Sequence, residues 1–214
     1  MSTKKRIAEA TIARLSVYAR ALCELDEKGM EIISSDELGE KVGCTGAQIR
    51  KDLSFFGEFG EIGKGYHVRD LKDALSQVLG IDREWNVALV GAGYLGSALA
   101  AYPQFDKRGF VFRAVFDNDI RKVGKRWGSV PIQHVSELPE TVRERNISIG
   151  IIAVPAQAAQ EIAEMLVASG VRAVLNFAPT RVAVPEDVRV RDVDLSTELE
   201  CLSYFLTSEA GPGT

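Results

Sequence analysis

Residues that bind metals or form disulfides are scarce in this sequence. It has three cysteines and two histidines among 214 residues, and no C-x-x-C pair. The cysteines, Cys23, Cys44 and Cys201, are far apart and odd in number. This pattern fits neither a disulfide framework nor a zinc site, so we expect reduced thiols and no bound metal.

Long apolar segments are also absent. No run approaches the ~18 apolar residues that a membrane span requires. The basic start MSTKKRIAEA lacks the apolar core of a secretory signal, so we expect a cytoplasmic protein. The net charge of −4 gives no general reason to expect a nucleic acid partner. Binding depends on local Lys and Arg side chains, however, so a motif must decide.

Proline is missing from the first part of the chain, because all seven prolines lie at or beyond Pro103. Residues 1–80 accordingly read mostly as helix, whereas strand-like and helical patterns alternate afterwards, as in a parallel α/β sheet. The predicted fold is α/β, with three parts. They are an N-terminal winged helix-turn-helix domain (1–80), a Rossmann-type parallel-sheet domain (81–194) and a C-terminal helix and tail (195–214). The strand-like runs are 86–90, 111–116, 130–135, 147–154 and 171–177.

Three helices are predicted in the N-terminal part. Apolar residues spaced four and three apart indicate the first, and Gly29 ends it. These residues are Ala8, Ile12, Leu15, Ala19 and Leu22. A second helix begins at a capping box of Ser34 and Glu37, and a third runs from Thr45 to about Phe56. Two short helices joined by a tight turn indicate a helix-turn-helix.

The third helix carries side chains suited to DNA. Ile49 and Leu53 are expected to face the core, which leaves polar residues outward where recognition helices enter the major groove. Arg and Gln can read guanine and adenine, whereas Lys and Ser are better phosphate partners. The candidate DNA-binding residues, including two from the following segment, are Thr45, Gln48, Arg50, Lys51, Ser54, Lys64 and Tyr66.

That following segment, residues 57–68, has four glycines and predicts a β-hairpin wing with Lys64 at its tip. Tyr66 suits packing better than base stacking. The alternative is a three-helix bundle with a solvated charged face, in which Gln48 only closes a capping box with Thr45.

A glycine-rich motif directly follows the strand-like run 86–90. It has the form G-x-G-x-x-G and opens a helical pattern, which predicts a dinucleotide site. Gly91 would permit a tight turn, Gly93 would let the pyrophosphate approach, and Gly96 would let the helix pack on the sheet. The predicted phosphate loop comprises Gly91, Ala92, Gly93, Tyr94, Leu95 and Gly96.

An acidic residue stands where the adenosine ribose would bind. Asp117 ends the second strand, and its carboxylate would accept hydrogen bonds from ribose hydroxyls and repel a 2′-phosphate. NAD(H) is therefore favoured over NADP(H), although Arg121 and Lys122 nearby leave the second open. A later strand ends at the same edge of the sheet, where an apolar nicotinamide pocket is expected. Its residues would be Ala153, Val154 and Pro155.

Catalytic groups are not apparent. A dehydrogenase needs a proton donor or acceptor beside the nicotinamide and a substrate domain, but only residues 195–214 remain after the Rossmann pattern. We expect no catalytic residue, and a nucleotide that is sensed. The alternatives are an NAD-dependent oxidoreductase with a helical appendage and a coenzyme A- or nucleotide-binding subunit of a larger enzyme.

The C-terminal residues predict an apolar helix, with Thr197 and Glu200 as a capping box. It could pack on its own domain or on a partner subunit. We favour dimerisation because helix-turn-helix proteins usually bind two half-sites as dimers. The apolar positions are Leu195, Leu199, Leu202 and Leu206.

Taken together, these stretches resemble the Rex redox-sensing repressors of bacteria over nearly the whole chain. The most specific is Gln48–Gly60, followed by Gly65-Tyr66. Supporting stretches are Gly91–Gly96, Phe116–Asp119, Ala153–Pro155 and Asn176–Pro179.

The resemblance implies a homodimer that binds a palindromic operator as a repressor and releases it when NADH binds. It implies that NADH and NAD⁺ are regulatory ligands and that the C-terminal helix is exchanged between subunits. It adds Lys122 and Asn176 to the nucleotide site. It also implies a switch formed by Arg14, Tyr102 and Asp194.

Overall fold

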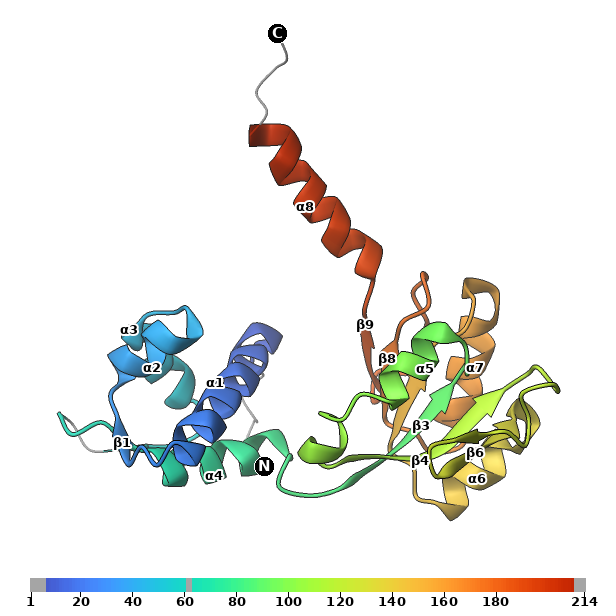
Figure 1. Cartoon of the computed structure of the whole chain (residues 1–214), viewed down its shortest axis with the longest axis horizontal. Coiled ribbons are helices and arrows are strands. Elements are labelled where there is room, and N and C mark those ends of the chain that lie inside the picture. Colours follow the sequence, from blue (N-terminus) through green and yellow to red (C-terminus); the bar gives the residue numbers. More distant parts are fainter. Residues whose placement is uncertain (1–6, 61–62, 210–214) are drawn as a thin grey trace, which may run out of the picture. The chain divides into compact units, whose positions relative to one another are not determined.

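The computed structural model describes residues 7–60 and 63–209. The chain divides into two compact units, Met1–Arg83 and Glu84–Thr214 (Figure 1). None of the helices in the described ranges is both long and apolar enough to cross a membrane.

The first unit packs four helices on one another beside a two-stranded sheet (Figure 1). Its core is one buried cluster to which all four helices contribute. In chain order the elements are α1 (Glu9–Glu27), β1 (Ile32–Ile33), α2 (Ser35–Val42), α3 (Gly46–Leu53), β2 (Tyr66–His67) and α4 (Val68–Leu79).

Helix α1 buries a different stripe from the one predicted. Ile12 is 44% exposed, and Ala8 precedes the helix as its N-cap, so these two positions were wrong. The stripe instead includes two polar residues that an apolar pattern cannot detect, Thr11 and Tyr18, because their polar atoms find partners inside the unit. The buried residues of α1 are Thr11, Leu15, Tyr18, Ala19, Ala21, Leu22 and Leu25.

The helix-turn-helix forms where the sequence predicted it. The Ser34 hydroxyl accepts a hydrogen bond from the Glu37 N–H at 3.1 Å, and the Glu37 carboxylate accepts one from the Ser34 N–H at 2.8 Å. Helix α2 ends at Gly43, whose φ of 73° is left-handed. The turn is tight because Gly39 has no side chain, since a Cβ there would lie 2.5 Å from the carbonyl oxygen of Cys44.

Helix α3 is shorter than predicted. Thr45 is its N-cap, with the Gln48 N–H donating to the Thr45 hydroxyl at 3.2 Å. It ends at Leu53 rather than Phe56, because the Phe56 N–H bonds to the carbonyl of Leu53 in a tighter turn.

The predicted hairpin was wrong in its partner. The described strand of this segment, β2, pairs antiparallel with β1, Ile33 lying opposite Tyr66. Gly65 makes this possible, because a Cβ there would lie 2.6 Å from the Ile33 carbonyl oxygen. Lys64 belongs to a turn before β2, and residues 61–62 of the predicted wing lie outside the described residues.

The second unit is a seven-stranded sheet in the order β5-β6-β4-β3-β7-β8-β9, parallel except for the β5–β6 pair. This confirms the predicted parallel α/β sheet. The strands are β3 (Trp85–Val90), β4 (Phe110–Asp117), β5 (Arg126–Trp127), β6 (Val130–His134), β7 (Ile149–Ile152), β8 (Ala173–Asn176) and β9 (Arg189–Asp192). The helices are α5 (Tyr94–Ala100), η1 (Asp106–Arg108), η2 (Val135–Glu137), α6 (Leu138–Glu144), α7 (Ala156–Ala168) and α8 (Leu195–Glu209).

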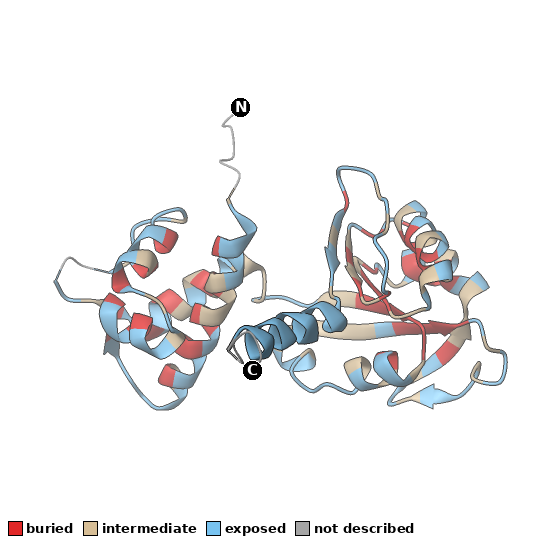
Figure 2. Ribbon diagram, turned by 90° about the horizontal axis from the view of Figure 1, so that it is seen from above, coloured by how far each residue is buried: buried red, intermediate tan, exposed pale blue. Residues whose placement is uncertain are grey.

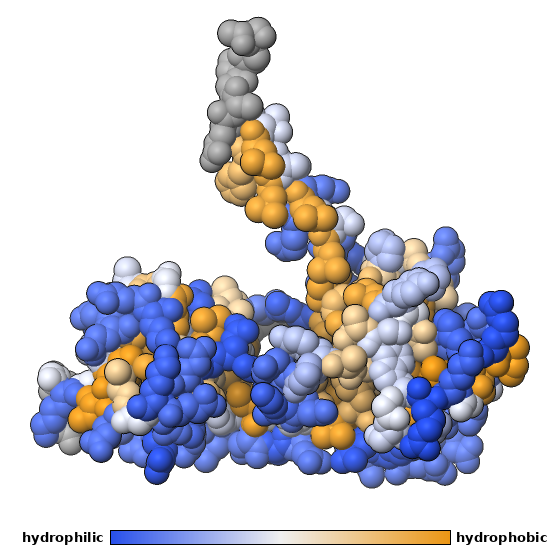
Figure 3. Space-filling view, viewed as in Figure 1, coloured by the Kyte–Doolittle hydropathy of each residue, from blue (hydrophilic) through white to orange (hydrophobic). Residues whose placement is uncertain are grey.

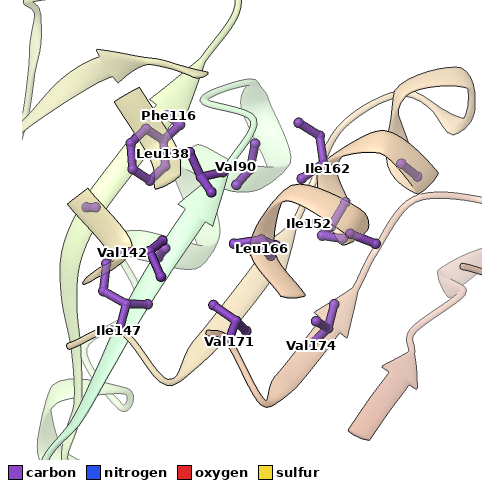
Figure 4. Close-up of a cluster of buried hydrophobic side chains, with 14 of the residues drawn as sticks. Val90, Phe116, Leu138, Val142, Ile147, Ile152, Ile162, Leu166, Val171 and Val174 are labelled. Atoms are coloured by element: carbon purple, nitrogen blue, oxygen red, sulfur yellow. The ribbon is translucent and has the colours of Figure 1, made fainter. Parts of the chain in front are cut away.

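Both faces of this sheet are covered, which is why its central strands are continuously apolar. On β3, Ala88 and Val90 join a cluster with α6 and α7, whereas Val87 and Leu89 face a second cluster that includes α5. Figure 4 shows the first cluster, with Leu138 and Leu166 of the helices pointing toward the sheet. Burial is concentrated in the central strands and the inner sides of the helices (Figure 2).

Strand β3 lies at the point where the order of the strands along the sheet reverses. Strand β4 lies on one side of β3 and β7 on the other, so the loops that follow them diverge. In open parallel sheets the ligand crevice lies at the carboxyl ends of the strands at this point. The fold therefore puts the loop after β3 at the centre of the candidate nucleotide site.

Helix α8 begins at Leu195, but its predicted capping box was wrong. The Asp194 carboxylate accepts a hydrogen bond from the Ser196 N–H at 2.9 Å instead. Every residue from Leu195 to Ser208 is exposed, including Phe205, which packs edge-on against Tyr204. The apolar side of the helix is visible in Figure 3.

Candidate DNA and nucleotide sites

Most of the predicted DNA-binding residues lie on α3, at its two caps and in the turn before β2. Thr45, Arg50, Lys51, Ser54 and Lys64 are exposed, and Gln48 is half-buried.

Tyr66 does not belong to this surface. Its side chain is packed in the core of the first unit, where the residue is 8% exposed. Burial raises the pKa of its hydroxyl, and the charge of Arg50 nearby opposes the shift. Tyr66 is therefore a packing residue, the role for which the sequence favoured it over base stacking.

Two of the predicted base-reading side chains are held by neighbours. Arg50 reaches back to the start of α2, where its guanidinium donates to the Ser35 hydroxyl and lies 3.8 Å from the Asp36 carboxylate. The Gln48 amide nitrogen donates to Asp52 at 2.8 Å. The expected capping box between Gln48 and Thr45 is therefore only half formed, because the Gln48 side chain bonds elsewhere.

Asp52 was missed by the sequence reasoning. It is 1% exposed and accepts hydrogen bonds from several side chains of α1 and α3. A signal existed, since Asp52 lies three residues after Ile49 and next to Leu53, on the face predicted to be buried. A charged residue at an inward position indicates a paired carboxylate.

The phosphate loop has the geometry that its glycines predict. Gly91 has a φ of +104°, and a Cβ there would lie 2.3 Å from the Ala153 carbonyl oxygen. A Cβ at Gly96 would lie 2.0 Å from the Gly91 carbonyl oxygen. A Cβ at Gly93 would meet no atom within 4 Å, so this is where the loop leaves room for an approaching group. The loop thus fits a pyrophosphate at Gly93.

The remaining loop residues differ in exposure. Ala92 is buried and donates its N–H to Asp117, whereas Tyr94 is 98% exposed and Leu95 is partly exposed at 38%. Tyr94 is the first residue of α5, so its ring stands on the outside of the loop.

Asp117 is fixed at the end of β4 beside this loop. Its carboxylate accepts hydrogen bonds from the N–H groups of Ala92 at 2.9 Å and Asp119 at 2.8 Å, and from the Lys122 ammonium at 2.8 Å. Burial alone would raise the pKa of Asp117, but the bonds from Lys122, Asp119 and Ala92 lower it below its ordinary value. The group is an anionic acceptor at neutral pH.

The loops after β3, β7 and β8 come together at the carboxyl edge of the sheet. The Ala153 N–H donates to the Val90 carbonyl, and the Phe177 N–H donates to that of Ile152, each at 2.8 Å. Ala153 and Val154 are half-buried beside Gly91, and Pro155 is exposed.

Asn176 has its polar side-chain atoms inside the protein. Its amide donates to the Thr180 carbonyl at 2.7 Å and to the Asp192 carboxylate at 2.8 Å, and accepts from the Ala178 N–H at 3.0 Å. The residue is 0% exposed. This amide shapes the loop after β8 rather than presenting a donor to a ligand.

The three expected switch residues each have a partner in their own unit. Arg14 forms a two-point ion pair with Asp52, at 2.6 and 2.8 Å. Tyr102 is 54% exposed and packs edge-on against Phe105, with 5.5 Å between the centres of the two rings. Asp194 bonds to the first turn of α8.

A helix-turn-helix unit followed by a nucleotide-type Rossmann unit defines a class, the DNA-binding regulators that carry a dinucleotide site. Residues 6–54 match the family described as "Putative DNA-binding protein N-terminus", and residues 82–180 match "CoA binding domain".

Comparison with curated proteins identifies the family. The chain is 51% identical over 201 residues to the redox-sensing transcriptional repressor Rex of Desulforamulus reducens, covering 94% of this chain and 96% of that one. It is 46% identical over 211 residues to Rex of Streptomyces coelicolor, covering 98% of this chain and 82% of the other. The chain belongs to the Rex family of redox-sensing transcriptional repressors.

Solved structures agree with this assignment. The crystal structure of RSP in complex with β-NAD⁺ and operator DNA superposes with a TM-score of 0.92 and 40% identity, covering 95% of this chain and 94% of that one. The crystal structure of RSP in complex with β-NADH superposes with a TM-score of 0.86 and 38% identity, and the match covers 96% of each chain. The expectation of a regulator rather than an enzyme is confirmed by this family, which replaces the oxidoreductase alternative.

Proposed function

We propose that this protein is a transcriptional repressor that binds operator DNA through α3, senses the NADH/NAD⁺ ratio through its second unit, and releases the operator when NADH binds. The observation that carries the proposal is that both units align, along almost the whole chain, with RSP, a Rex-family repressor that has been solved with operator DNA and β-NAD⁺. The residues in each unit suit these two ligands.

The proposed DNA surface consists of α3 and the turn before β2. Arg50 and Gln48 read bases, and Thr45, Lys51, Ser54 and Lys64 contact phosphates. Arg50 is suited to leave Asp36 for DNA, because that pair is 3.8 Å long and both side chains are largely exposed. Exposed ion pairs of this kind contribute only about 0.2–1 kcal/mol, which a bidentate contact to guanine exceeds at about 1–3 kcal/mol.

The proposed nucleotide site is the carboxyl edge of the second sheet. The pyrophosphate lies at the loop Gly91–Gly96, the adenosine ribose at Asp117, and the nicotinamide against Ala153–Pro155. Lys122 adds a cation beside Asp117. Asn176 contributes by holding the loop after β8 in place.

The proposed dimer is based on the exposed apolar side chains of α8. Each of these large side chains would contribute about 1.5–3 kcal/mol on full burial. We propose that a second copy covers them, with α8 exchanged between subunits, and that the two α3 helices bind a palindromic operator. The exposed apolar residues of α8 are Leu195, Leu199, Leu202, Tyr204, Phe205 and Leu206.

The proposed switch couples Arg14, Tyr102 and Asp194. Arg14 and Tyr102 are accessible, with a third of the Arg14 side chain and half of Tyr102 exposed, so both can exchange partners. A ligand shifts such an equilibrium only by its differential affinity for the two states. The proposal therefore requires NADH, and not NAD⁺, to favour the state that leaves DNA.

The test uses the full chain and a fluorescent operator fragment selected from random double-stranded DNA. Fluorescence anisotropy at fixed salt follows release while NADH, and separately NAD⁺, is added. We expect release at much lower NADH than NAD⁺. Arg50→Ala should abolish operator binding in the anisotropy measurement, and the variant should still bind NADH in calorimetry. The proposal would be refuted if neither nucleotide changed DNA binding, or if the protein selected no DNA from the random pool.

A further inference from the structure

The buried carboxylate of Asp52 lies at the junction of α1 and the DNA-reading helix. Arg14 donates to both of its oxygens, from Nε at 2.6 Å and Nη2 at 2.8 Å. The Tyr18 hydroxyl donates at 2.9 Å and the Gln48 amide nitrogen at 2.8 Å, with the Thr11 hydroxyl at 3.5 Å. Three of these partners belong to α1, and Gln48 belongs to α3 itself.

This carboxylate is charged in the folded protein. Burial acts to raise the pKa of Asp52, but the hydrogen bonds from Arg14, Tyr18 and Gln48 bring it below the ordinary value. The hydrogen bond to Asp52 likewise raises the pKa of Arg14. An unpaired buried charge is strongly unfavourable, so the charged carboxylate depends on the several donors that surround it.

One of these donors is a side chain proposed to read a base. Gln48 precedes Asp52 by one helical turn, a spacing at which side chains meet. A glutamine recognises adenine by using its oxygen and its N–H₂ group together, which requires a defined amide plane. Among the described residues, the bond to Asp52 is the only hydrogen bond that this amide makes, which leaves its oxygen and second N–H for another partner.

We infer that Asp52 is a positioning residue for DNA recognition, which orients the Gln48 amide toward one base and fixes α3 on α1. This inference rests on the proposed contact between α3 and DNA. Arg14 has a second role in it, because its guanidinium neutralises a carboxylate that would otherwise repel nearby phosphates. Without the Asp52 charge, α3 keeps its apolar contacts through Ile49 and Leu53 but loses the fixed amide.

The test compares base preferences rather than affinity alone. Wild type, Gln48→Ala, Asp52→Asn and the double variant are titrated against the selected operator and a panel with each base pair replaced. Gln48→Ala should reduce discrimination at one base pair by about 5- to 100-fold. Asp52→Asn should flatten the preference at the same base pair, and the double variant should do no more. Asp70→Asn, an exposed position of α4, is the matched control and should change nothing.

The outcomes distinguish the role of Asp52 from the proposed function. Loss of preference only in Gln48→Ala, or a uniform loss over all base pairs in Asp52→Asn with a lower melting temperature, overturns the role of Asp52 while DNA recognition stands. Failure of the wild type to select any DNA overturns the proposed function and this inference with it.

A second measurement covers the case in which Asp52→Asn does not fold. In ¹⁵N-labelled wild type, the side-chain N–H₂ of Gln48 should be rigid on the nanosecond scale by heteronuclear relaxation. That of Gln77, which is exposed on α4, should be mobile. Equal mobility of the two amides would overturn the inference, because a positioning contact must restrain the group.

Discussion

Among the described residues, each unit has one buried carboxylate with several donors, but the donors are of different kinds. Asp52 is held by side chains from two helices, whereas Asp117 receives most of its bonds from backbone N–H groups of adjacent loops. A side chain can change rotamer and release its acceptor, but a backbone group can do so only if its loop moves. The first arrangement ties one helix to another through their side chains, and the second suits a rigid ligand site.

The largest expected effect is loss of stability in Asp52→Ala. The change leaves Arg14 and Gln48 without their acceptor, so we expect the unfolding free energy of the first unit to fall by about 3 kcal/mol. This is the low end of the range for breaking a buried ion pair, because Arg14 is 34% exposed and can rehydrate. Urea unfolding followed by circular dichroism measures it.

The chain supplies an internal control for this experiment. Both tryptophans, Trp85 and Trp127, lie in the second unit, so their fluorescence reports on that unit alone. Their urea transition should stay in place in Asp52→Ala. A shift of the fluorescence transition by as much as the dichroism transition would mean that the two carboxylates are not independent.

The second effect concerns the nucleotide. Asp117→Ala removes an ionised acceptor whose hydrogen bonds are worth about 1.5–3 kcal/mol each, so we expect NADH affinity to fall at least tenfold in calorimetry while operator binding persists. Glu144→Ala, at an exposed position of α6, is the control with the same charge change. Undiminished NADH affinity would contradict the rigid-site role of Asp117.

Acid should weaken both units, each through its own carboxylate. The folded pKa of both groups lies below the ordinary value of 3.8. Their stabilisation is therefore fully present above that value and is lost as the pH falls through the lower folded pKa. Comparing unfolding at neutral pH and near pH 3, Asp52→Asn should reduce the acid sensitivity of the dichroism transition alone. An unchanged acid sensitivity would argue that Asp52 is not ionised in the folded unit.

The smallest expected effect concerns NADPH. Arg121 makes three side-chain hydrogen bonds to Asp119, which lower the pKa of that carboxyl to about 2. Asp119→Asn would weaken these hydrogen bonds and leave the Arg121 guanidinium available near the proposed ribose site. We expect NADPH affinity to rise by about threefold, in line with an exposed ion pair, and NADH affinity to stay constant. Calorimetry with both nucleotides measures it, and equal gains for both would show a non-specific charge effect.

Features that depend on neighbouring residues were predictable from the sequence. The capping box of Ser34 and Glu37 is decided within four positions, and the loop Gly91–Gly96 by its glycines and the strand before it. The parallel sheet followed from the alternation of strands and helices. For the same reason, Asp117 could be placed at the end of its strand without knowledge of the strand order.

Features that depend on distant partners were not predictable. Strand β1 has two residues and pairs with β2 across the helix-turn-helix, so the pattern around Tyr66 suggested a local hairpin instead. Asn176 matched the family motif, but only the structure shows that its amide is used by the loop itself. The inward position of Asp52 could be predicted from the buried face of its helix, but its partners Arg14 and Tyr18 could not, because they are far from it in sequence.

The exposed apolar side of α8 makes the stability and pairing of the protein depend on its concentration. If that side is covered only by a second copy, dilution uncovers it, and mass action then reduces the melting temperature as well as the fraction of paired chains. In the proposed dimer, two α3 helices would bind a palindromic operator only while the two chains are paired. The response of such a sensor to its nucleotide is therefore defined only at a stated protein concentration, and its dose curve must shift when the chain is scarce.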